Sequence, residues 1–83
     1  MGEGHRGEVA VFEQLFEVLP DGEVTPKVWV RIGDTDFGPG AHFGPNYRPH
    51  GLPIGEWPKA RIWGHRERHG EHEVFVIERP SIP

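Results

Sequence analysis

Glycine and proline are concentrated in the middle of this 83-residue chain, and that concentration limits the folds available to it. Of the 12 glycines and 9 prolines, 11 lie within 33–58. Both residues disrupt helices and central strands, so the two more regular segments are expected over 8–32 and 59–79. A chain this short builds one hydrophobic core. We therefore expect a single domain over 1–83, with flexible ends at 1–7 and 80–83.

The first regular segment contains the turn signal Leu19-Pro20-Asp21-Gly22-Glu23. Proline presets the first turn position, aspartate can bond its own backbone and glycine accepts a positive φ, so the signal favours a β-hairpin with a three-residue loop. The ladder that follows contains these pairs: Leu19 with Glu23, Phe16 with Pro26, Phe12 with Val30, and Ala10 with Ile32. Gln14 is then the single polar residue on the apolar face. The alternative is a helix over 8–19, because Glu13, Gln14 and Glu17 share one helical face.

The second regular segment, 59–79, also predicts a hairpin, reversing at His69-Gly70. A two-residue loop pairs Arg68 with Glu71, Arg66 with Glu73 and Arg61 with Glu78, whereas a longer loop pairs Lys59 with Glu78. Both registers give the same two faces. One face holds Ala60, Ile62, Phe75 and Ile77, and the other holds Arg61, Trp63, His65, His72, Val74 and Val76.

Two hairpins that each have one apolar face can bury those faces against each other. We therefore expect an all-β fold, a small sandwich or partly open barrel built from two antiparallel hairpins joined by a long Gly/Pro-rich loop at 33–58. The alternative is an α+β fold with a helix at 8–19. The loop is rich in aromatic residues, which predicts that it is pinned to the sheet, with a short strand near 36–43 or 52–57. Pro26 favours an edge strand or a bulge.

Composition argues against several classes of function. The absence of cysteine excludes disulfides, Cys-ligated zinc and thiol nucleophiles. A formal net charge of -4 makes nucleic acid an improbable partner, and no apolar run approaches the ~18 residues of a membrane span, so we expect a cytoplasmic location and no membrane. The only serine, Ser81, lies three residues from the end of the chain. We therefore expect no enzyme, no catalytic residues and no cofactor.

Histidine suggests one alternative function. His65, His69 and His72 lie around the second reversal, where His65 and His72 share a face. Two imidazoles with a neighbouring carboxylate or loop histidine could bind Zn²⁺, so the alternative function is a metal-binding hairpin at 65–72, with hydrolysis as the activity such a site could support. The Arg, Glu and Gly residues around them are typical of a solvated turn, and we favour that interpretation, with no metal ligands assigned.

The surface aromatic residues support the leading hypothesis. Trp29 and Trp63 lie on the polar faces of the two hairpins beside Arg or Lys, and Trp with Arg is enriched where proteins bind one another. Together with the loop aromatics they predict one partner-binding surface, composed of Trp29, Arg31, Phe43, Tyr47 and Trp63. The competing interpretation is that the tryptophans only cover their own sheets. We expect a small non-enzymatic β domain that binds a protein partner or assembles with itself.

Overall fold

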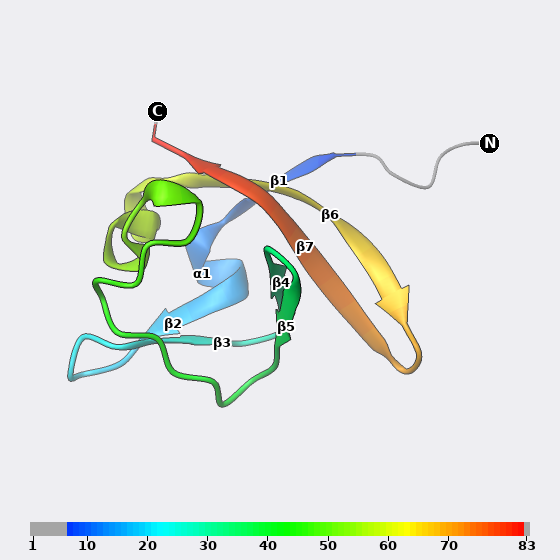
Figure 1. Ribbon diagram of the computed structural model, residues 1–83, viewed down its shortest axis with the longest axis horizontal. Coiled ribbons are helices and arrows are strands. Elements are labelled where there is room, and N and C mark those ends of the chain that lie inside the picture. Colours follow the sequence, from blue (N-terminus) through cyan, green and yellow to red (C-terminus); the bar gives the residue numbers. More distant parts are fainter. Residues whose placement is uncertain (1–6, 83) are drawn as a thin grey trace.

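The structure is a computed structural model that describes residues 7–82 (Figure 1). Its elements, in chain order, are β1 (Glu8–Val11), α1 (Phe12–Leu15), β2 (Phe16–Val18), β3 (Val24–Pro26), β4 (Trp29–Ile32), β5 (Thr35–Phe37), the 3₁₀ helices η2 (Pro49–Gly51) and η3 (Ile54–Lys59), β6 (Arg61–His69) and β7 (His72–Ser81). The flexible end expected at 1–7 lies outside the described residues, apart from Gly7. At the other end, β7 continues through Ser81, so residues 80–81 belong to the sheet.

The strands form two sheets. The larger has the order β1-β6-β7-β4-β5, and β2 pairs with β3 in the smaller. All pairs are antiparallel except β4 with β7, which is parallel. In Figure 1 the β6–β7 hairpin projects beyond the rest of the molecule. The all-β prediction is confirmed, and within 7–82 the sheets do not close into a barrel. The alternative helix over 8–19 is wrong, because α1 spans only four residues.

The first hairpin is confirmed only close to its turn. The Leu19 N–H donates to the Glu23 carbonyl at 2.7 Å, and Phe16 pairs with Pro26 as expected. The pairs expected further from the turn are wrong: β1 pairs with β6 instead, and β4 pairs with β7. The helical turn α1 separates β1 from β2 and changes the direction of the chain. That turn buries Phe12, Leu15 and Phe16 together, at the i, i+3, i+4 spacing of one helical side.

The second hairpin is confirmed, with a different register. His69 pairs with His72, so the loop is Gly70-Glu71, and Gly70 has a φ of 67°. The directly opposite positions expected from the His69-Gly70 loop, and the Lys59–Glu78 pair of the longer loop, are therefore wrong. Arg66 and Glu73 nevertheless form the expected ion pair, with Nη1 3.5 Å from Oε1. The face assignment is confirmed, since Ala60, Ile62, Phe75 and Ile77 are all buried. A β-bulge between Trp63 and Gly64 leaves Glu78 without an opposite residue.

The core lies between one face of the five-stranded sheet and the layer formed by α1, β2, β3 and η3. Trp57 on η3 is fully buried, and its Nε1–H donates to the Leu52 carbonyl at 3.0 Å. Phe43 pairs with Val24 of β3, and the short strand expected near 36–43 is β5. Residues 52–57 belong mainly to a 3₁₀ helix instead of a strand. The long loop is thus pinned by its aromatic residues, as predicted.

Candidate functional site

The outer face is the face of the five-stranded sheet that points away from the core. The helices and the β2–β3 sheet pack on the opposite face, through Ile62, Phe75 and Val30. Strand pairing and side-chain alternation define the residues of the outer face. They are Val9 and Val11 from β1, Arg61, Trp63, His65, Glu67 and His69 from β6, His72, Val74, Val76 and Arg79 from β7, Trp29 and Arg31 from β4, and Asp36 from β5.

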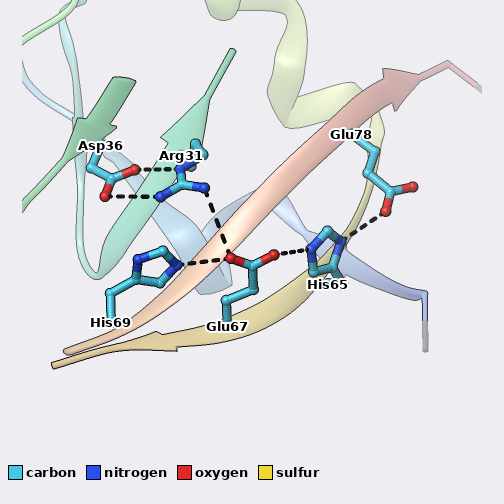
Figure 2. Close-up of polar contacts among 6 residues, drawn as sticks. All are labelled: Arg31, Asp36, His65, Glu67, His69 and Glu78. Carbon is cyan, nitrogen blue, oxygen red and sulfur yellow. Dashed lines mark hydrogen bonds and ion pairs between the residues drawn. The ribbon is translucent and has the colours of Figure 1, made fainter. Parts of the chain in front are cut away.

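A cluster of charged side chains lies across this face (Figure 2). Glu67 is at its centre, with its carboxylate oxygens 2.8 Å from His65 Nε2 and 2.8 Å from His69 Nε2. The other ring nitrogen of His65, Nδ1, lies 2.9 Å from Glu78 Oε2. An imidazole donates from both nitrogens only when it is protonated. The position of His65 between two carboxylates therefore favours the imidazolium.

The cluster extends from β6 to β4 and β5 through Arg31. Arg31 Nε donates to Asp36 Oδ1 at 2.6 Å and Nη2 donates to Oδ2 at 3.4 Å, while Nη1 lies 3.8 Å from Glu67 Oε1. We call the six residues drawn in Figure 2 the Glu67 cluster: Arg31, Asp36, His65, Glu67, His69 and Glu78. Because β7 lies between β6 and β4, the Arg31–Glu67 contact crosses over the middle strand. Val74 on that strand is only 1% exposed, although it points away from the core.

Hydrogen bonding sets the protonation behaviour of the cluster. The hydrogen bonds to Glu67 and then Glu78 raise the pKa of His65 above its ordinary value of 6.5. Hydrogen bonds from His69 and then His65 lower the pKa of Glu67 from 4.5 to about 2. The hydrogen bond from Arg31 lowers the pKa of Asp36. In each case the charged form is the one that makes the bond, so the geometry stabilises an ionised cluster.

The other end of the outer face is basic and apolar. Arg61 and Arg79 are exposed there, and the Arg79 guanidinium carbon lies 5.1 Å from the centre of the Trp63 ring. Val9 and Val11 on the adjacent strand β1 are 43% and 51% exposed. We call these five residues the basic end. The outer face therefore has opposite charge character at its two ends.

The five residues predicted to form one partner-binding surface are divided by the structure. Trp29, Arg31 and Trp63 share the outer face. Phe43 is 8% exposed and packs in the core, and the exposed ring of Tyr47 stacks on it at a centroid distance of 5.2 Å. The burial of Phe43 removes it from the candidate surface, and Tyr47 covers Phe43 instead of extending the outer face.

Trp29 is half-buried on the outer face. Its ring lies 4.6 Å from the His72 ring, and a Cβ placed on Gly38 would come within 2.8 Å of Trp29 Cζ2. The His72 ring of β7 and the backbone of Gly38, which directly follows β5, therefore both pack against the indole. The packing of Trp29 agrees in part with the interpretation that this residue covers its own sheet. The exposed part of the indole forms a rigid aromatic edge beside the Glu67 cluster.

Glu67, Val9 and Val11 are functional candidates that sequence reasoning missed. One signal could have identified Glu67: His65, Glu67 and His69 alternate along one strand, so their side chains share a face. Within the described chain, no group of three or more His, Asp or Glu side chains is arranged to hold a metal ion. Both ring nitrogens of His65 and Nε2 of His69 contact a carboxylate instead, so residues 7–82 show no preformed ligand set for the zinc alternative.

Comparisons with known proteins give no relative: no family model, curated protein or solved structure matches the chain. No helix among the residues described has both the length and the apolar character needed to cross a membrane.

Proposed function

We propose that this protein is a non-enzymatic interaction domain that associates with a second copy of itself through the outer face, in the cytoplasm. The observation that carries the proposal is the distribution of charge on that face, acidic at the Glu67 cluster and basic around Arg61 and Arg79. The cysteine-free composition fits a reducing compartment.

A two-fold symmetric dimer uses the same patch on both copies, so the patch must be complementary to itself. A face whose two ends carry opposite charge meets this requirement. When two outer faces meet about a two-fold axis perpendicular to the line that joins the two ends, the basic end of each copy lies over the Glu67 cluster of the other. Trp63 belongs to the basic end, Trp29 lies beside the Glu67 cluster and Val76 lies between them; all three are partly exposed, so they supply apolar contact area of the kind found in protein interfaces.

The outer face has the dimensions that such an interface needs. Five strands spaced about 4.8 Å apart give a width of roughly 20 Å, and a strand as long as β6 gives a length of roughly 30 Å. Stable interfaces bury about 800 Å² on each partner, roughly a sixth of the 5145 Å² of accessible surface here. The proposed interface therefore requires the whole outer face, with the accessible surface of its protruding side chains counted in addition to a flat area of roughly 600 Å².

Light scattering coupled to size-exclusion chromatography, over a range of concentrations, tests the proposal. Wild type is expected to form a dimer. Arg79→Glu reverses one charge of the basic end and is expected to weaken the dimer by about tenfold or more, since like charges then meet across the interface. Arg48→Glu is the matched control, because Arg48 is an exposed loop residue outside the outer face, and it is expected to leave the dimer intact.

A charge swap sharpens the test. Glu67→Arg alone is also expected to weaken the dimer, but an equal mixture of Arg79→Glu and Glu67→Arg copies is expected to form heterodimers, because each reversed charge then meets an opposite one. Circular dichroism checks that each variant is folded. A strictly monomeric wild type would overturn the proposal, even if it captured a different protein. Equal weakening by Arg48→Glu would overturn it as well.

A further inference from the structure

We propose that the Glu67 cluster makes association through the outer face pH-dependent: protonation of His65, which lies between two carboxylates, weakens the dimer, and its deprotonation strengthens it. The inference rests on the proposed function, since it names the regulation of the same face. It is carried by the position of the His65 imidazole, which contacts carboxylates that a second copy would otherwise bind.

The groups that face this cluster come from four strands. The charged or titratable side chains are Arg31 from β4, Asp36 from β5, His65, Glu67 and His69 from β6, and His72 and Glu78 from β7; Asp34, between β4 and β5, also acts on Arg31. Histidine is the side chain whose charge changes near neutral pH, and His65 contacts two of the carboxylates. We therefore assign the pH response of the cluster to His65.

Protonation changes both the charge and the availability of the carboxylates. With neutral His65, the three carboxylates of the cluster lie beside the guanidinium of Arg31 and attract Arg61 and Arg79 of a second copy. Protonation of His65 adds a positive charge between two of these carboxylates, so that attraction is weakened. The oxygens of Glu67 and Glu78 are then engaged within their own chain, at 2.8 and 2.9 Å from imidazole nitrogens.

The contacts of His65 set the range of the response. Its two carboxylate partners raise its pKa above 6.5, so His65 remains protonated at pH values where a free imidazole has already lost its proton. The dimer is therefore expected to be weak in mild acid and to strengthen as the pH rises above 6.5, through the raised pKa of His65.

Sedimentation equilibrium at about pH 5.5 and about pH 8.5 measures the effect. The wild-type dimer is expected to dissociate about tenfold more readily at the lower pH. His65→Gln is neutral at both values and is expected to lose most of this dependence. His42→Gln is the matched control, because His42 Nδ1 contacts Glu23 Oε1 at 2.9 Å, a similar contact outside the outer face, and this variant is expected to keep the wild-type dependence.

NMR titration of the His65 imidazole gives a readout that does not require association. Equal dimer affinity at both pH values, while His65 gains and loses its proton, would overturn the inference and leave the proposed function standing. Full pH dependence in folded His65→Gln would overturn it too. A wild type that is monomeric at both pH values would overturn the proposed function and, with it, the regulation of this face.

Discussion

Gly64 is the residue at which the backbone of the sheet leaves least room. It lies on the core side of β6, next to the β-bulge, where β6 and β7 change register. A Cβ at this position would collide with the Val76 carbonyl oxygen and would lie 2.6 Å from Phe75 Cε1. Glycine inside a strand is a sequence signal for a close approach of this kind. The signal does not reveal which backbone comes close.

Gly64→Ala is expected to destabilise the protein by roughly 1–3 kcal/mol, because the added methyl group overpacks a site whose neighbours include backbone. Urea unfolding monitored by circular dichroism measures the change. Gly44→Ala is the matched control, since a Cβ at Gly44 has no neighbour within 4 Å, and it is expected to change the stability little. Equal stabilities of the two variants would show that β6 and β7 can separate at Gly64 at no cost.

At the scale of elements, local signals were predictable and long-range pairing was not. The turn at Pro20-Asp21-Gly22 and the faces of the second hairpin follow from turn chemistry and alternation, which act over a few residues. Val30 and Ile32 of β4 point into the core whether β4 pairs with β1 or with β7, so the alternation of β4 does not identify its neighbour. The helical turn α1 separates β1 from β2 and prevents the pairing of β1 with β4. Its four residues are too few to produce a clear periodic signal in the sequence.

The same limit applies to the candidate site. Alternation along each strand predicts that Trp29 and Arg31 lie on the polar face of one hairpin and Trp63 on the polar face of the other. The structure joins these two faces in one sheet, which alternation alone did not predict. The contact of Arg31 with Glu67 depends on the parallel pairing of β4 with β7, which joins residues more than 40 positions apart. No local pattern contains that information. Phe43 was wrongly placed on the binding surface, because the sequence around a loop aromatic does not show whether its ring is exposed or completes the core. In the structure Phe43 is buried.

Gln14 is the polar residue that did not fit the apolar face of the expected hairpin, and in the structure it caps α1. Its Oε1 accepts a hydrogen bond from the Val11 N–H at 3.1 Å. Gln14→Ala is expected to cost roughly 0.5–2 kcal/mol of unfolding free energy, as the loss of a helix cap does. Gln14→Glu keeps an oxygen acceptor and is expected to retain most of the stability. Equal losses in the two variants by urea unfolding would contradict the capping role.

At the scale of the whole molecule, the ionised cluster and the overall charge act in the same pH range. The isoelectric point calculated from the sequence is about 5.8, where the net charge of the protein is near zero and repulsion between its own charges is weakest. The cluster holds its complete set of hydrogen-bonded charges in the same range, with Glu67 ionised and His65 protonated. Both effects favour the folded state over the unfolded state in mild acid.

The unfolding free energy of the monomer is therefore expected to be greatest between pH 4.5 and 6.5. Glu67 has a lowered pKa in the folded state, so its contribution is complete above 4.5 and disappears as the pH falls toward 2. His65 has a raised pKa, so its contribution is complete below 6.5 and disappears as the pH rises through the raised value. Urea unfolding at low protein concentration, which keeps the chain monomeric, is the measurement. Glu67→Gln should flatten the acid side of the profile and His65→Gln the alkaline side, whereas a wild-type stability that continues to rise above pH 6.5 would contradict the charged arrangement of the cluster.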